Sequence, residues 1–95
     1  MKMYIIVHGI VQGVGYRAFV KAQADRSSIS GYVKNMDDGS VEIFAIGQEG
    51  KLAEFASMLH VNEEHGPDVF YIEKHKEGDK GFVDKGDMDS FSIMK

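Results

Sequence analysis

Short apolar runs alternate along the chain with two stretches in which apolar residues recur every three or four positions. The first run, Met3–His8, is apolar on both faces, which favours a strand inside a sheet. Residues 16–25 follow with helical spacing, so the pattern predicts an amphipathic helix. Its apolar stripe consists of Tyr16, Phe19, Val20 and Ala24.

A β-hairpin is the clearest local signal. Two apolar-rich segments, Gly31–Met36 and Ser40–Ile46, flank the sequence Asp37-Asp38-Gly39. An Asp-Gly pair supplies the positive φ values that a tight turn requires. The two segments are therefore predicted to be antiparallel strands.

A second helix is predicted over Lys51–Val61, after a turn at Gly47–Gly50 and before Gly66-Pro67. Its apolar positions repeat at i, i+3, i+4 and i+7. They are Leu52, Phe55, Ala56 and Leu59.

The last third of the chain predicts two strands separated by a solvated loop. Val69–Glu73 is rich in β-branched and aromatic residues, which is typical of a strand. Glycine and charged residues dominate Glu77–Asp87, which favours a loop. Phe91 and Ile93 then alternate with serines in a short final strand.

The element order β-α-β-β-α-β predicts an α+β fold of the ferredoxin-like type. Two helices would cover one face of an antiparallel sheet, and a short extra C-terminal strand would complete it. Residues 1–95 are enough for one domain with its own core. A right-handed crossover through the first helix would place the strand Gly31–Met36 near the first strand.

Composition narrows the possible partners. The net charge is −4, so we expect no nucleic-acid partner, which would require a basic surface. The chain has no cysteine, so it cannot form a disulfide. It also has no run of 18 apolar residues, so we expect no membrane partner. We expect a cytoplasmic protein, without a targeting segment, that acts as a monomer.

The segment Gly9–Arg17, between the first strand and the first helix, is the strongest candidate site. Its three glycines fall within seven positions, so the backbone can curl and direct several N–H groups at one point. The helix that follows adds the free N–H groups of its first turn. Arg17 adds a fixed charge and a planar fork that can hold two oxygens of an anion. We interpret the segment as a phosphate or carboxylate cradle.

Asn35 is the second candidate. On the period of a strand it shares a face with Gly31 and Val33, so it can point to the side where the loop and the first helix lie. Asparagine is a poor strand former, which suggests that its amide has a use.

Four separated segments of the chain together resemble the acylphosphatase family. They are Gly9–Arg17, Gly31–Asn35, Asp38–Glu42 and Gly66-Pro67. The resemblance covers nearly the whole chain, and two motifs with the correct gap are far less expected by chance than either alone. It implies hydrolysis of small-molecule acyl phosphates, with no cofactor and no metal.

The resemblance also assigns roles to particular residues. It implies that Arg17 binds the phosphate together with the loop amides, and that Asn35 orients the attacking water. The loop amides concerned are those of Gln12, Gly13, Val14, Gly15 and Tyr16.

The residue types suit this chemistry. The Gly9–Arg17 motif contains no His, Asp, Glu or Lys that could act as a general acid or base. An acyl phosphate releases a carboxylate, whose acid has a pKa of about 4, so the leaving group needs no proton. What remains is to hold the phosphoryl group and to place water in line with the bond that breaks.

Other interpretations of the same residues remain open from the sequence. Gly13-x-Gly15-x-x-Ala18 with a later Asp38 fits the dinucleotide-binding fingerprint, but that acid falls in a hairpin turn and no second mononucleotide half follows. Taken singly, Arg17 fits a surface ion pair and Asn35 fits a residue that precedes a turn. The alternative function is a non-catalytic anion- or RNA-binding module on the same scaffold. A related possibility is descent from the acylphosphatase-like domain of carbamoyl-phosphate-handling maturation proteins.

Overall fold

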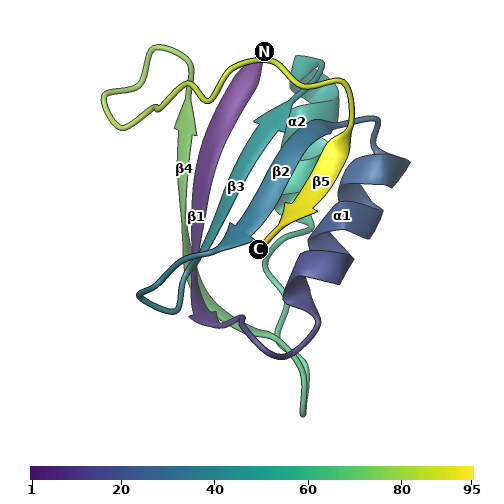
Figure 1. The fold of residues 1–95 in the computed structure, drawn as a ribbon, viewed down its shortest axis with the longest axis vertical. Coiled ribbons are helices and arrows are strands. Elements are labelled where there is room, and N and C mark those ends of the chain that lie inside the picture. The colour runs from purple at the N-terminus through teal and green to yellow at the C-terminus, as the bar shows by residue number, and fades with distance from the viewer.

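A computed structural model describes all residues, 1–95, as seven elements (Figure 1). The order is βαββαβ followed by one short strand, which confirms the predicted fold class. The strands are β1 (Lys2–Ile10), β2 (Ser30–Asn35), β3 (Val41–Ile46), β4 (Asp68–Lys76) and β5 (Phe91–Met94), and the helices are α1 (Tyr16–Arg26) and α2 (Glu49–Ser57).

The five strands form one sheet in the order β4-β1-β3-β2-β5. The pairs β4–β1, β1–β3 and β3–β2 are antiparallel, but β5 pairs with β2 in parallel. The sheet is therefore mixed: the four strands of the βαββαβ unit are antiparallel, as predicted, and the extra strand β5, whose direction was not predicted, is parallel to β2. The reason is the connection over residues 77–90. The chain leaves β4 at the end of the sheet where β2 begins, and it crosses directly to that end of the opposite edge (Figure 1).

Strand β2 lies next but one to β1, because β3 is inserted between them. This is the split βαβ arrangement, in which the first crossover leaves room for a strand. The β2–β3 hairpin has the predicted antiparallel pairing, with Asn35 opposite Val41. Gly31 is essential to this pairing. Its φ is +130°, and a Cβ atom there would lie 1.8 Å from the carbonyl oxygen of Phe44.

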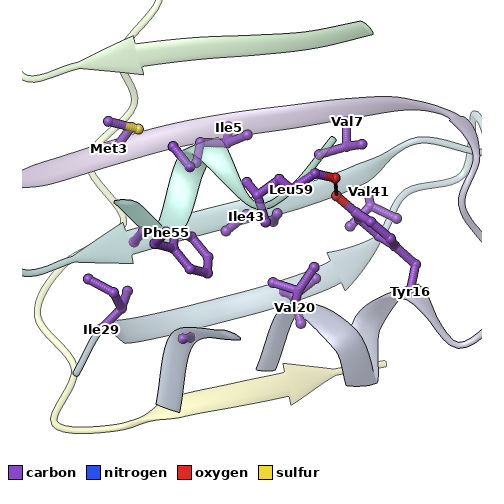
Figure 2. Packing of buried hydrophobic residues seen from close by; sticks show 14 of the residues in the cluster. Met3, Ile5, Val7, Tyr16, Val20, Ile29, Val41, Ile43, Phe55 and Leu59 are labelled. Carbon is purple, nitrogen blue, oxygen red and sulfur yellow. Dashed lines mark hydrogen bonds between the residues drawn. The ribbon is translucent and has the colours of Figure 1, made fainter. Parts of the chain in front are cut away.

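Both helices pack on one face of the sheet over a continuous apolar core (Figure 2). Helix α1 contributes its predicted stripe, of which Tyr16, Val20 and Ala24 are buried. The hydroxyl group of Tyr16 donates to the carbonyl oxygen of Leu59 across this core at 2.7 Å. Neither helix has the length and apolar content needed to span a membrane.

The second helix differs from its predicted range, 51–61. It begins at Glu49, so the last two residues of the predicted turn belong to it, and it ends at Ser57. The backbone N–H of Met58 turns back to the carbonyl of Phe55 and closes the helix. Leu59 is nevertheless buried, because its side chain continues the apolar stripe after the helical backbone has ended.

Residues 77–90 form no helix or strand and are mostly exposed, as predicted for this loop. Side-chain contacts with Lys2 and Phe44 attach it to the sheet face opposite the helices. The ammonium group of Lys2 pairs with Asp84 at 3.0 Å and with Asp87 at 3.1 Å. The ring of Phe82 lies against that of Phe44, with centroids 6.4 Å apart.

Candidate active site

The loop between β1 and α1 presents a run of unpaired backbone donors. Gly13 and Gly15 have φ values of +75° and +80°, a left-handed conformation that glycine adopts without a steric cost. None of the backbone N–H groups from Gln12 to Ala18 donates a hydrogen bond to another group of the protein. A run of free N–H groups that continues into the first turn of a helix is a site for an anion.

A cavity of about 220 Å³ lies at this loop, between the start of α1 and the ends of β2 and β5. Arg17 and Asn35 both line it, although they come from different elements, so the fold brings these two residues to one space. The remaining lining residues are Val11, Gly13, Gly15, Tyr16, Ala18 and Ile93. Of the residues singled out from the sequence, Gln12 and Val14 do not line the cavity.

Arg17 is held by the C-terminal strand. Its Nη1 atom donates to the carbonyl oxygen of Met94 at 2.8 Å, and no other protein acceptor is bound by the guanidinium. One turn along α1, Lys21 donates to the carbonyl oxygen of Phe91 at 3.0 Å. Two cations of one helix thus hold β5, and most of the five N–H donors of Arg17 are left for a ligand.

Asn35, which lines the cavity, carries an unused acceptor. Its Oδ1 atom is buried and has no hydrogen-bond partner within the protein. An unpaired buried amide oxygen costs about 1–3 kcal/mol, so such atoms are rare and call for a reason. A ligand or a bound reactant that donates a hydrogen bond to Oδ1 would provide that reason.

Gln12 points away from the cavity, towards the β2–β3 hairpin. Its Nε2 atom donates to two carbonyl oxygens, that of Met36 at 2.8 Å and that of Ser40 at 2.9 Å. The hairpin is further stabilised by Asp38, which accepts from the hydroxyl group and the backbone N–H of Ser40. These two bonds lower the pKa of the Asp38 carboxyl group.

The cavity is electrostatically simple. Arg17 carries the only full charge among the lining residues, and no Asp, Glu, His or Lys lines the cavity. The nearest phenol is buried in the core, and this burial raises the pKa of Tyr16, which therefore stays neutral. The structure contains no group of three or more His, Cys, Asp or Glu side chains arranged as metal ligands. The geometry and charge favour a single anion.

Comparison with known proteins agrees with this geometry. A family model described as Acylphosphatase matches residues 3–93. The chain belongs to the acylphosphatase family. This match spans the loop, both catalytic candidates and the first three residues of β5.

Individual acylphosphatases support the assignment. That of Pasteurella multocida is 38% identical over 93 residues, which are 98% of this chain and 97% of that protein. That of Bacillus velezensis is 52% identical over 59 residues, and this alignment covers 62% of the chain and 66% of the relative. An alignment with the acylphosphatase of Solibacter usitatus, at 50% identity, covers only 56% of that relative.

Solved structures share the fold over the full chain. The crystal structure of acylphosphatase from Bacillus subtilis has a TM-score of 0.79 and 39% identity, with complete coverage of both chains. The crystal structure of HypF from T. kodakarensis has a TM-score of 0.80 and 32% identity, and the matched region is 12% of that chain. The same fold therefore occurs both alone and within a much longer protein.

Two features of this acylphosphatase-family site were missed by the sequence analysis. Ile93 lines the cavity, and Met94 binds Arg17 through its backbone. The alternation of Phe91 and Ile93 predicts a strand, but it does not say which neighbour that strand pairs with. The parallel pairing of Ile93 with Val33 of β2 brings β5 to the site.

Proposed function

We propose that this chain hydrolyses acyl phosphates to a carboxylate and inorganic phosphate by direct in-line attack of water. The observation that carries the proposal is that Arg17 and Asn35 face one cavity at a loop of free backbone N–H groups. In the reaction the water oxygen forms a bond to phosphorus and the P–O bond to the acyl group breaks. The carboxylate leaves with the electron pair, and a proton of the water passes to solvent.

The roles follow from the chemistry of each group. The guanidinium of Arg17 and the N–H groups of Gln12, Gly13, Val14, Gly15 and Tyr16 hold the phosphoryl oxygens and stabilise their charge. The free amide oxygen of Asn35 accepts a hydrogen bond from the water and orients it. No general acid is needed, because the leaving carboxylate is the anion of an acid with a pKa of about 4.

The finer features of the proposal come from the sequence. We propose that residues 1–95 act as one acylphosphatase domain on small-molecule acyl phosphates, without a cofactor, as a cytoplasmic monomer. The net charge of −4 argues against a nucleic-acid partner, since an acidic chain repels phosphate backbones outside a local site.

Phosphate release from acetyl phosphate and benzoyl phosphate tests the function. We expect hydrolysis that persists in excess chelator, while p-nitrophenyl phosphate, a monoester with a poorer leaving group, is spared. If neither acyl phosphate is hydrolysed while inorganic phosphate still binds, the chain is instead a non-catalytic anion-binding module.

A further inference from the structure

We propose that Gln12 is a positioning residue, whose side chain holds the phosphate loop in register with the strand that carries Asn35. The proposal rests on the proposed function, because it concerns the relative placement of the phosphoryl group and the water. It assigns the Gln12 side chain a role that differs from the one proposed above for its backbone N–H, which is to hold the phosphoryl group with the other loop amides.

The side chain of Gln12 contacts the hairpin directly beyond Asn35. Met36 follows Asn35 directly, and its carbonyl oxygen accepts from Gln12 Nε2 at 2.8 Å. The second acceptor, the carbonyl of Ser40, also receives the backbone N–H of Met36 at 2.9 Å. One side chain therefore binds both residues of the pair that closes the hairpin beyond Asn35.

A carboxamide is the group that can do this. Its single nitrogen carries two N–H donors, one for each carbonyl oxygen, and it has no charge. A glutamate of the same shape would present oxygens to two carbonyl oxygens and repel both. A methionine would have a similar length but no donor.

The loop needs such a connection because it has few others. Its backbone N–H groups from Gln12 to Ala18 make no protein hydrogen bonds, and two of its residues, Gly13 and Gly15, are glycines with a positive φ and no side chain to pack. The bonds from Gln12 are the only hydrogen bonds between the loop and the hairpin. Apolar packing of Val11 and Val14 fixes the loop to the core.

The chemistry is sensitive to this connection. The phosphoryl group is held by the loop, and the water is held by the hairpin strand, so the in-line distance depends on how the two elements lie. A displacement of about 1 Å from a reactive geometry can reduce the rate about 100-fold. Binding of phosphate depends on the loop and Arg17 alone. Loss of the Gln12 side chain should therefore reduce turnover without weakening the binding of phosphate.

The test compares Gln12→Met and Gln12→Glu with Gln48→Met. The control makes the same substitution at an exposed glutamine that precedes α2 and forms no side-chain hydrogen bond. We expect Gln12→Met to lower kcat about 10- to 100-fold on acetyl phosphate, with the inhibition constant of inorganic phosphate within about twofold of wild type. Gln12→Glu should be at least as impaired, and Gln48→Met should match the wild type.

A double-mutant cycle with Asn35→Ala separates positioning from a general loss of folding. Once Asn35 is removed, its placement no longer matters, so the combined loss in kcat should be close to that of Asn35→Ala alone. Additive losses, a kcat within twofold of wild type in Gln12→Met, or a parallel loss of phosphate binding would overturn the proposal. We expect Gln12→Met to fold, because the carbonyl oxygens of Met36 and Ser40 each keep a backbone N–H partner. Thermal unfolding checks that each variant is folded.

A measurement independent of activity distinguishes this proposal from the proposed function. In ¹⁵N–¹H spectra, Gln12→Met should shift the loop amides and the side-chain amide of Asn35, whereas Gln48→Met should not. If wild type hydrolyses no acyl phosphate, the proposed function fails, and these shifts still decide whether the connection exists. Unchanged spectra in Gln12→Met would refute the connection itself.

Discussion

Arg17→Gln is the sharpest test of the site, because the two roles of this side chain differ greatly in size. The substitution keeps an amide donor but removes the positive charge and the planar fork. It also breaks the hydrogen bond from Nη1 to the carbonyl oxygen of Met94. In the proposed mechanism the loss of charge and fork affects the reaction, whereas the loss of this hydrogen bond affects how β5 is held.

The two effects can be compared from the structure. Removal of one preorganised donor at a developing charge lowers the rate about 10²–10³-fold, and Arg17 supplies a full charge as well. Loss of the bond to Met94, whose donor is charged, costs at most about 1.5–3 kcal/mol of unfolding free energy. A domain with a stability of about 5–15 kcal/mol would remain almost entirely folded after such a loss. A fall in activity of 100-fold or more therefore cannot arise from unfolding.

Lys21→Met is the matched control. Lys21 lies one turn along α1 and also donates to a carbonyl group of β5, at 3.0 Å, but it does not line the cavity. Its loss should weaken the attachment of β5 to a similar extent and leave kcat/KM for benzoyl phosphate within about twofold of wild type. Thermal unfolding and initial rates of both variants complete the assay.

Two results would refute this reasoning. Arg17→Gln with more than a tenth of wild-type activity would show that the guanidinium does not stabilise the transition state. Equal losses in both variants would show instead that the attachment of β5, not the charge in the cavity, limits the reaction.

Three further predictions concern other parts of the structure. Asn35→Ala should lower kcat by about 10²-fold with little change in KM, since in the proposed mechanism Asn35 orients water and does not bind phosphate; steady-state kinetics that show a change in KM alone would contradict this. Gly31→Ala should destabilise the fold by more than about 3 kcal/mol in denaturant unfolding, because its Cβ would overlap the carbonyl oxygen of Phe44. Burial and the hydrogen bond to Glu42 raise the pKa of Tyr4 to about 12, above its value of 10.0 in the unfolded chain. Stability from this phenol is complete below pH 10 and should fall between pH 10 and 12, and Tyr4→Phe should flatten that part of the stability curve; an unchanged slope would count against it.

The sequence was sufficient to predict most of the fold, because apolar spacing follows from local backbone geometry. The Asp37-Asp38-Gly39 turn located the hairpin, and the stripe from Tyr16 to Ala24 located α1. The same reasoning placed the end of α2 too late. Leu59 lies at helical spacing and is buried, but a side chain can reach the core from a chain that is no longer helical.

The direction of β5 could not be predicted in this way. Its alternation of apolar residues identifies a strand, but either orientation of that strand buries Phe91. Parallel pairing with β2 is set by where β4 ends and where the loop over residues 77–90 crosses the sheet, and these are properties of the whole chain.

The candidate site also has features that the sequence predicts and features that depend on the tertiary structure. The sequence by itself determined the chemical groups, because the residue type fixes the functional group of each side chain. These groups are a glycine-rich loop before a helix, the guanidinium of Arg17 and the carboxamide of Asn35. Only the tertiary structure decided that the carbonyl oxygen of Met94 holds Arg17 and that Gln12 binds the hairpin. Both acceptors are backbone carbonyl groups, which every residue has, so only the position of the chain in space distinguishes them from any others.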